Sequence, residues 1–333
     1  MHYYDDVYGR CQVQEGLLTD LMRSSAVRRL RKVSQAGASS FVRPGRTNTR
    51  HEHSVGVMTL TGILGGTEQE QAAGLLQDLS HTAFSHTIDV LFENRKEQFH
   101  EDIFDSVIEN SDVPQILKKH GTTWRELFSK ENLGRVDASA PLLCADRIDY
   151  TLRDLIRTGY LTASAARAFV EQLDFLDGII VSTEVEAAEK FVVWYSHLVG
   201  DVFMNPVELY THHVFAQLLK KALRVGVITE ADLMSTDDVV LGKLLADDAH
   251  GLDAGLSEIR RVRSVTVGDQ AHGVRVYSKG RKIDPPVVVN GQIRRLSEVR
   301  PETTKAWSKI DFISSEGLLV SAPSADHEKA GMP

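Results

Sequence analysis

Apolar residues recur every three or four positions along most of the chain, which is the spacing of one buried face of an α-helix. Between positions 19 and 34, for example, Leu21, Val27 and Leu30 share one side, and basic residues occupy the others. Further helical windows cover residues 50–64, 68–80, 85–94, 97–110, 112–120, 140–158, 162–173, 185–202, 205–224 and 236–262. The pattern predicts a mainly α fold, with one large helical domain over residues 1–262.

The pattern changes after position 262, where short runs of β-branched residues replace the helical period. Asn290-Gly291 lies between Val287–Val289 and Gln292-Ile293, and this dipeptide is a strong signal for a two-residue hairpin turn. We therefore predict a small β-rich C-terminal appendage over residues 263–320. Residues 321–333 are rich in small and charged side chains, so we predict a disordered tail there.

Composition and charge match an ordinary globular protein. Of the 333 residues, 42% are hydrophobic and 25% are charged, with a formal net charge of −8. This acidic balance disfavours nucleic acid as a partner, so an anionic substrate would need a local cluster of cationic groups. No stretch approaches about 18 uninterrupted apolar residues, and the first residues lack a signal-peptide pattern. Only Cys11 and Cys144 occur, which are too few for a disulfide framework and fit a reducing compartment. Together these features predict a cytoplasmic protein without membrane attachment.

Metal-competent side chains are concentrated in one region of the sequence. They are the histidines and aspartates between positions 51 and 100, namely His51, His53, Asp78, His81, His86, Asp89 and His100. Asp146 and Asp149 follow in a later helical window. Hydrolytic metal sites take imidazole and carboxylate ligands from several elements and leave one position open for water. Any one of these side chains alone is more often structural, so the prediction depends on the ordered set.

Several segments in this order resemble those of HD-domain phosphohydrolases. They are, in chain order, Asp5–Gly9, Arg29–Gly37, Asn48–Gly56, Leu75–His86, His100-Glu101 and Cys144–Asp154. The third resembles Asn-x-Arg-Phe-Glu-His-Ser-x-Gly, and the fourth resembles Leu-x-His-Asp-x-x-His-x-x-Phe-Ser-His. The pattern covers residues 5–154 and is similar to the branch that contains the mammalian SAM-and-HD-domain deoxynucleoside triphosphate triphosphohydrolase and its short bacterial relatives. The resemblance implies an HD-domain helical core.

The resemblance also implies a role for each matching residue. The metal ligands would be His53, Asp78 and Asp146, with position 77 supplying a fourth. The cofactor would be one divalent ion of unknown identity (Fe, Mn, Co, Mg, Ni or Zn), with a second Mg²⁺ arriving with substrate as an open option. The phosphate contacts would be Arg50 and Arg147, whose guanidinium groups suit phosphate oxygens.

The remaining implied roles concern proton transfer and substrate recognition. The catalytic group would be His81, His86, His100 and Asp149. One of the histidines would supply the proton to the leaving oxygen. Gln35 and Asp154 would approach the sugar, and Tyr210 would stack against the sugar or base.

Position 77 departs from the family pattern because it holds Gln77 where the His of the His-Asp pair belongs. An amide oxygen can coordinate a hard cation such as Mg²⁺ or Mn²⁺, but it binds softer transition metals poorly. Three explanations remain open: a deliberate inactivating substitution, a natural variant that favours a harder metal, and a natural pseudoenzyme that binds nucleotide without cleaving it. With Gln77 in place, we predict weak or absent turnover.

Two other features bear on the substrate. The mammalian relative carries an Arg and a His where this chain has Val202 and Pro206, so a monophosphate or modified nucleotide competes with a triphosphate as substrate. His212 and His213, which follow, are interpreted as structural. The basic turn Lys279–Pro286 reads either as a solvated hairpin loop or as a segment that carries Arg281 or Lys282 over the mouth of the pocket.

The sequence as a whole predicts metal-dependent hydrolysis of a phosphate ester or anhydride of a nucleotide, either a triphosphate or a nucleoside monophosphate. The resemblance further implies a homo-oligomer, a dimer or higher. Three alternatives stay open: a non-catalytic nucleotide-binding sensor, a scaffold whose histidines are structural, and a polynucleotide hydrolase.

Overall fold

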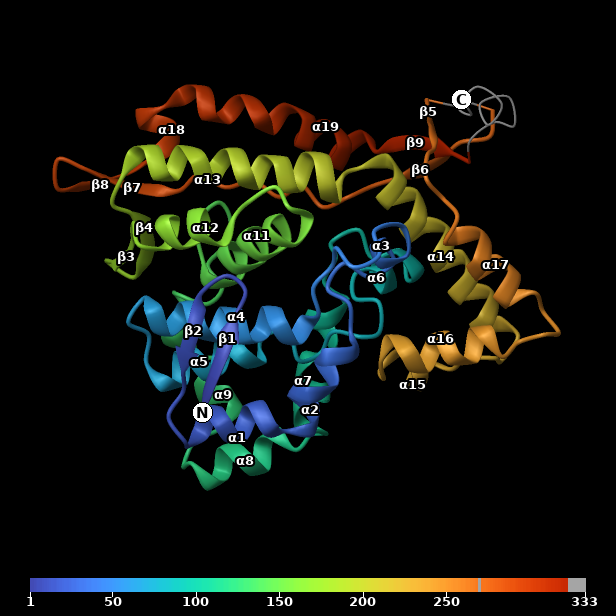
Figure 1. Cartoon of the computed structure of the whole chain (residues 1–333), viewed down its shortest axis with the longest axis horizontal. Coiled ribbons are helices and arrows are strands. Elements are labelled where there is room, and N and C mark those ends of the chain that lie inside the picture. Colours follow the sequence, from blue (N-terminus) through green and yellow to red (C-terminus); the bar gives the residue numbers. More distant parts are fainter. Residues whose placement is uncertain (269–270, 323–333) are drawn as a thin grey trace.

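The computed structural model describes residues 1–268 and 271–322, and helices dominate it, as predicted (Figure 1). The N-terminal half contains β1 (His2–Asp5), β2 (Gly9–Gln12), α1 (Leu17–Arg23), α2 (Ser25–Arg29), η1 (Leu30–Lys32), α3 (Ser39–Val42), α4 (Arg50–Ile63), α5 (Glu68–Leu76), α6 (Thr87–Leu91), α7 (Phe99–Glu109), α8 (Val113–Lys119), α9 (Trp124–Leu127), α10 (Lys130–Leu133), α11 (Ala145–Thr158) and α12 (Ala163–Val170). The mainly α class predicted from the sequence is confirmed.

The second half mixes helices with short strands. It contains β3 (Leu173–Leu176), β4 (Ile179–Ser182), α13 (Val185–His197), η2 (Leu198–Phe203), α14 (Pro206–Arg224), α15 (Glu230–Leu233), α16 (Asp237–Leu245), α17 (Leu252–Ile259), β5 (Thr266–Val267), β6 (Val274–Val276), β7 (Pro286–Val289), β8 (Gln292–Arg295), α18 (Leu296–Val299), η3 (Pro301–Ala306), α19 (Trp307–Glu316) and β9 (Leu318–Ser321). η2 is a π-helical continuation of α13.

The C-terminal segment joins the helical part through a shared sheet. β7 and β8 form the hairpin predicted around Asn290-Gly291, and β7 also pairs in parallel with β4, Ser182 opposite Val287. α18, η3 and α19 lie in the same segment, so it contains helices as well as the expected strands. Ser321, placed by sequence in the tail, instead pairs with Thr266 in a three-stranded sheet of β5, β9 and β6. Residues 323–333 of the predicted tail lie outside the described residues.

Several predicted helices are shorter than the periodicity suggests. The window at 68–80 ends as a helix at Leu76, and Gln77 to Ser80 form a turn. The window at 85–94 shrinks to α6 because Phe84 and Ser85 adopt positive φ angles of 60° and 46°, which no α-helix accommodates. The turn at Gln77–Ser80 matters for function, because it ends α5 just before Gln77 and Asp78, which are expected to bind metal.

The buried apolar side chains form two clusters. One joins α1, α4, α5, α11 and α13 with residues of the C-terminal segment, and the other joins α6 with α14 to α17. α4 packs against both α5 and α11, so the three helices expected to carry metal ligands are neighbours in the core (Figure 1). Among the described residues, no helix is both long enough and apolar enough to cross a bilayer.

The start of α4 is fixed by a capping box. The hydroxyl of Thr49 accepts a hydrogen bond from the backbone N–H of Glu52 at 3.1 Å, and the Glu52 carboxylate accepts one from the N–H of Thr49 at 2.7 Å. Substituting Thr49→Ala is expected to lower the free energy of unfolding by about 1 kcal/mol, which urea denaturation would measure. Thr47→Ala, two residues before the cap, serves as the control; an equal loss there would contradict a specific cap.

Candidate active site

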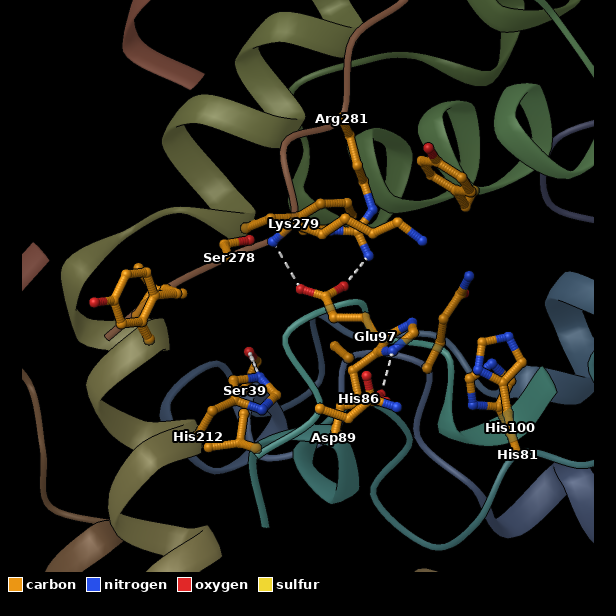
Figure 2. A pocket seen from close by; sticks show the side chains of 18 of the residues that line it. Ser39, His81, His86, Asp89, Glu97, His100, His212, Ser278, Lys279 and Arg281 are labelled. Carbon is orange, nitrogen blue, oxygen red and sulfur yellow. Dashed lines mark hydrogen bonds and ion pairs between the residues drawn. The ribbon is translucent and has the colours of Figure 1, made fainter. Parts of the chain in front are cut away.

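A cavity of about 660 Å³ lies at the junction of the helical part and the C-terminal segment (Figure 2). Most of the residues that the sequence assigns to the site line it: Gln35, Arg50, His53, Gln77, Asp78, His81, His86, His100, Asp146, Arg147 and Asp154. Asp149 and Tyr210 are absent from this lining, and so is His51, which lies half-buried beside Arg31. The cavity thus gathers side chains separated by more than a hundred positions in the chain.

Two of the expected metal ligands, Asp78 and Asp146, approach a third, His53, in this cavity. His53 Nε2 lies 2.9 Å from an oxygen of Asp146 and 3.5 Å from an oxygen of Asp78. The side-chain nitrogen of Gln77 is 3.1 Å from the same Asp146 oxygen and 3.3 Å from His53 Nε2. α4 supplies the imidazole, the C-terminal end of α5 supplies Gln77 and Asp78, and the first turn of α11 supplies Asp146.

The chemistry of this donor set fits a divalent cation. His53 is fully buried, and its Nδ1 lies 2.8 Å from the buried carboxylate of Asp149, which leaves Nε2 free to face the other ligands. Burial alone would lower the pKa of His53, but the contacts with Asp146 and Asp149 raise it to about 10. A bound metal ion would supply these carboxylates with the positive charge that the imidazole proton otherwise provides.

Gln77 is positioned as a ligand, although its amide presents nitrogen to the cluster. The Nε2 group faces Asp146 and His53, and rotation of the amide by half a turn would present Oε1 instead. In that orientation the oxygen suits a hard cation. In two groups of side chains, the metal-competent atoms lie within 4.8 Å of one another. One group is Asp78, His81 and His100, and the other is Asp137, Cys144 and Asp146.

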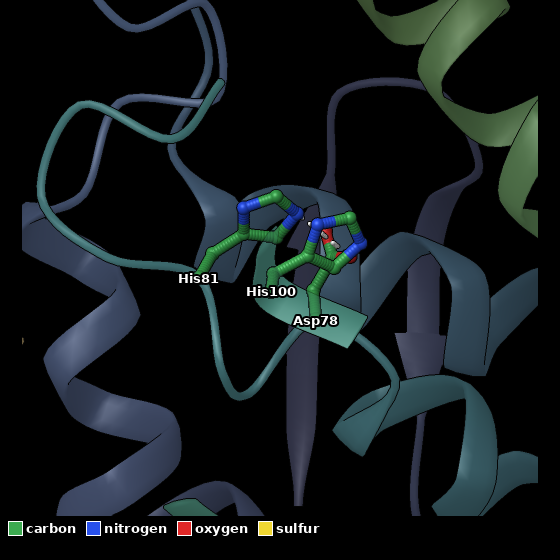
Figure 3. A group of neighbouring side chains, drawn as sticks. All are labelled: Asp78, His81 and His100. Carbon is green, nitrogen blue, oxygen red and sulfur yellow. Dashed lines mark ion pairs between the residues drawn. The ribbon is translucent and has the colours of Figure 1, made fainter. Parts of the chain in front are cut away.

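Three histidines cluster beside Asp78, and Figure 3 shows two of them, His81 and His100. The rings of His81 and His100 are parallel, with centroids 3.9 Å apart, and His86 meets both rings edge-on. Burial lowers the pKa of His100 to about 4 and that of His81 well below its usual value, so both rings are neutral near pH 7. Asp78 lies 3.5 Å from His81 Nε2.

His86 differs because a carboxylate orients it. Its Nδ1 lies 2.9 Å from Asp89, whose other oxygen accepts a hydrogen bond from the backbone N–H of Phe99. The ring is half-buried and lines the cavity. A carboxylate behind one ring nitrogen fixes the orientation of the imidazole and leaves the other nitrogen for a reacting group.

The two arginines expected to bind phosphate are held differently. Arg50 donates to Asp78 at 2.6 Å and to the Ser85 hydroxyl at 3.0 Å. Arg147 donates to the carbonyl of Leu142 and contacts Cys144 Sγ at 3.2 Å, so part of its fork supports the loop before α11. Both guanidinium groups line the cavity, and their contact with phosphate stays a prediction.

Several other residues of the cavity wall are polar. Asp154 accepts a hydrogen bond from Asn48 at 2.7 Å, and Gln35 Oε1 is buried without a partner among the described residues. His212, interpreted as structural, bonds to the Ser39 and Thr87 hydroxyls, yet its ring lines the cavity.

Sequence reasoning missed several lining residues, which are Asp137, Tyr195, Phe203, Tyr277 and Glu97. Tyr210, expected to stack against substrate, instead packs against the main apolar cluster, so aromatic contacts to a ligand would come from other rings. These residues lie in segments outside the family-like motifs, and no spacing in the sequence singles them out.

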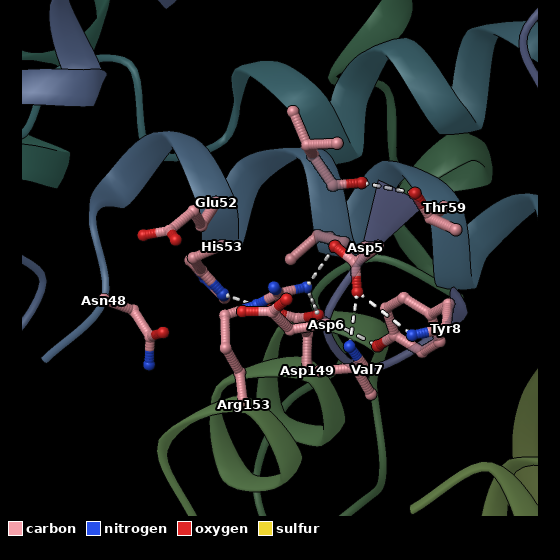
Figure 4. A network of polar contacts seen from close by, with 12 residues as sticks. Asp5, Asp6, Val7, Tyr8, Asn48, Glu52, His53, Thr59, Asp149 and Arg153 are labelled. Carbon is pink, nitrogen blue, oxygen red and sulfur yellow. Dashed lines mark hydrogen bonds and ion pairs between the residues drawn. The ribbon is translucent and has the colours of Figure 1, made fainter. Parts of the chain in front are cut away.

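Behind His53, a buried ionic network anchors the ligand helix (Figure 4). Arg153 forms two hydrogen bonds with Asp149, at 2.9 and 2.8 Å, and a third with Asp5 at 2.9 Å. The Tyr8 hydroxyl donates to Asp149 at 2.9 Å. Asp149, grouped by sequence with the catalytic residues, therefore positions His53 from behind instead of facing the cavity.

This network leaves no room for a side chain at Gly56 on α4. An added Cβ would lie 2.1 Å from atoms of both Arg153 and Asp149. Gly56→Ala is expected to destabilise the protein by about 1–3 kcal/mol, because the buried ion pair would have to move. Gly62→Ala on the same helix is the matched control, since its Cβ would meet only the flexible end of Gln71. Equal unfolding midpoints for the two variants would contradict the packing argument.

No protein-family model matches the chain, but individual known proteins do. The uncharacterized protein YdhJ of Bacillus subtilis is 41% identical over 321 residues, covering 96% of this chain and 98% of the relative. The metal-dependent phosphohydrolase cns2 of Cordyceps militaris is 29% identical over 297 residues, covering 86% of this chain and 85% of the relative.

Two further matches extend the comparison. The deoxynucleoside triphosphate triphosphohydrolase SAMHD1 of Gallus gallus is 30% identical over 157 residues, which is 40% of this chain and 25% of that protein. The crystal structure of a phosphohydrolase from Bacteroides thetaiotaomicron shares the fold, with a TM-score of 0.74 at 17% identity over 96% of this chain and 98% of that one.

The chain belongs to the HD-domain phosphohydrolase superfamily. One of its relatives, cns2, is named a metal-dependent phosphohydrolase, and this supports the hydrolase class and a divalent metal ion as cofactor.

Proposed function

We propose that this protein hydrolyses a phosphate ester or anhydride of a nucleotide at the cavity around His53, Asp78 and Asp146. The observation that carries the proposal is that Asp78 and Asp146 both approach His53 Nε2, with Arg50 and the histidine cluster beside them. The name of the SAMHD1 relative, a deoxynucleoside triphosphate triphosphohydrolase, supports a nucleotide substrate. The cavity, at about 660 Å³, is large enough for a nucleotide.

The residues of the site divide the reaction between them. His53, Asp78, Asp146 and the Gln77 amide would hold the divalent ion. When bound, that ion would lower the pKa of a water molecule and neutralise charge on the phosphate. Arg50 would donate the part of its guanidinium fork not used by Asp78 and Ser85 to a phosphate oxygen. These contacts align phosphorus with the attacking water.

Proton transfer to the leaving group would come from His86. Water attacks phosphorus, the P–O bond to the leaving group breaks, and the leaving oxygen takes a proton. His86 suits this role because Asp89 orients its ring at the cavity wall, whereas burial lowers the pKa of both His81 and His100. Gln35 and Asp154, which also line the cavity, would contact the sugar.

A second candidate, a nucleotide-binding protein without turnover, is favoured by one observation. As placed, the Gln77 amide turns its nitrogen, which cannot coordinate a cation, toward Asp146 and His53, and its oxygen would face them only after a half-turn. A screen separates the two functions: metal content is measured first, and nucleotide mono- and triphosphates are then tested for phosphate, pyrophosphate or triphosphate release with Mg²⁺, Mn²⁺, Co²⁺ or Fe²⁺. The hydrolase proposal predicts metal-dependent product that a chelator abolishes.

The outcomes of this screen are distinct. No product from any nucleotide or simple phosphomonoester, even after Gln77→His, would reject the hydrolase. Nucleotide-dependent thermal stabilisation without product would then support the binding protein. A cytoplasmic location and assembly into dimers or larger oligomers remain predictions, and sedimentation analysis would test the second.

A further inference from the structure

The segment from Arg275 to Lys282 crosses the cavity from the C-terminal side, between β6 and β7. Every residue of this segment lines the cavity (Figure 2). It reaches the site from outside the family-like motifs, which end at Asp154. The wall opposite the histidine cluster is therefore supplied by a part of the chain that the proposed mechanism does not yet use.

Contacts on two sides hold the segment in place. Glu97 accepts a hydrogen bond from the backbone N–H of Lys279 at 2.9 Å and forms an ion pair with Arg281. On the other side Lys282 pairs with Asp311 of α19 at 2.7 Å. Glu97 has a φ of 53°, in the left-handed region that non-glycine residues seldom adopt, so its loop is held in a particular conformation.

The guanidinium of Arg281 has hydrogen-bonding capacity to spare. Its side chain is 19% exposed, and among the described residues only the Glu97 carboxylate accepts a hydrogen bond from it. A guanidinium carries five N–H donors, so most of them have no protein acceptor here. Phe203, 5.8 Å from the guanidinium carbon, gives the group an apolar neighbour and no acceptor.

The remaining donors suit a phosphate group. A planar fork with free N–H groups binds phosphate oxygens in pairs, and a site shielded from water strengthens those bonds. Displacement of Glu97 by the ligand is disfavoured, because that carboxylate is itself mostly buried and would be left unpaired. Glu97 therefore fixes one edge of the guanidinium and leaves the other edge for a ligand.

We propose that Arg281 is a phosphate-binding residue of this site and that Glu97 is its positioning residue. The identification of the ligand as a nucleotide rests on the proposed function. The binding of a phosphate group by Arg281 does not depend on it. Glu97 lies in the loop that joins His86 to His100, so the pair ties the C-terminal segment to the part of the site that handles the leaving group. Arg281 would then hold a phosphate oxygen on the side of the cavity away from the motif-bearing helices.

Titration calorimetry with inorganic pyrophosphate at fixed ionic strength tests the proposal. Arg281→Gln is expected to weaken binding by about 10- to 100-fold, because charge-assisted hydrogen bonds are lost. Arg281→Lys keeps the charge that pairs with Glu97 but lacks the fork, so an intermediate loss is expected; it also serves as the test if the Gln variant fails to fold. Arg294→Gln, on the β8 hairpin outside the cavity, should bind as the unchanged protein does.

The proposal is overturned if Arg281→Gln or Arg281→Lys binds pyrophosphate as tightly as the unchanged protein, if Arg294→Gln loses as much affinity, or if the unchanged protein binds none. Glu97→Gln supplies a double-mutant cycle: it should weaken binding in the original protein and have no further effect beside Arg281→Gln. Additive losses would reject the positioning role. Arg281-dependent pyrophosphate binding without hydrolysis of any nucleotide would reject the hydrolase proposal and leave this one standing.

Discussion

Gln77→His is expected to raise the affinity for the divalent ion and the rate of phosphate release by more than about 100-fold each, since even residues that only orient a metal ligand contribute 10- to 100-fold. The replacement puts an imidazole where the Gln77 nitrogen now lies 3.1 Å from Asp146 and 3.3 Å from His53 Nε2. A neutral imidazole offers transition metals a nitrogen lone pair, whereas the Gln77 amide can offer only its oxygen, which suits harder cations.

The control for this prediction is Gln71→His on the same helix. Gln71 lies away from the cavity and donates to the carbonyl of Gly66, so the new imidazole there should change neither metal affinity nor turnover. Metal titration of the purified proteins and a phosphate-release assay give the two measurements. Unchanged metal affinity in Gln77→His would mean that the ligands meet without forming a metal site.

The second large effect is expected from Asp149→Ala, which should lower the free energy of unfolding by about 3–5 kcal/mol, the usual result of removing one partner from a buried ion pair. The Asp149 side chain is fully buried and bonds to Arg153, His53 and Tyr8. Removing it leaves the buried Arg153 with Asp5 alone and frees the His53 ring to turn. Metal affinity should therefore fall together with stability.

Urea denaturation followed by metal titration would check both parts. Asp6→Ala is the matched control, because Asp6 is exposed and pairs with Arg157 at the surface, where ion pairs contribute less than about 1 kcal/mol. If Asp149→Ala unfolds at the same urea concentration as Asp6→Ala, the network does not anchor the ligand helix.

Prediction from the sequence is most complete where the chemistry of the residues and their spacing indicate the same element or site. The helical windows at 50–64 and 140–158 predict α4 and α11. The ordered motifs then predict that His53, Asp78 and Asp146 share a site, and the structure brings these side chains together.

The rest depends on information that the sequence does not display locally. The ion pair between Glu97 and Arg281 joins positions 184 residues apart, and no helical window or motif links the two. The turn at Gln77–Ser80 interrupts a window whose period continues, so periodicity alone extends the helix too far. The placing of Tyr210 follows from the rotation of α14 against the core, which a motif cannot specify.

The N-terminal hairpin has a consequence for how the protein can be handled and regulated. Asp5 and Tyr8, at the turn between β1 and β2, reach Arg153 and Asp149 and thereby support the rear of the metal-facing histidine. Trimming the first eight residues by a protease would remove both supports while every residue of the cavity lining stayed in the chain. Such a clipped molecule would keep its complete set of reactive groups and lose the rigid backing that aims them.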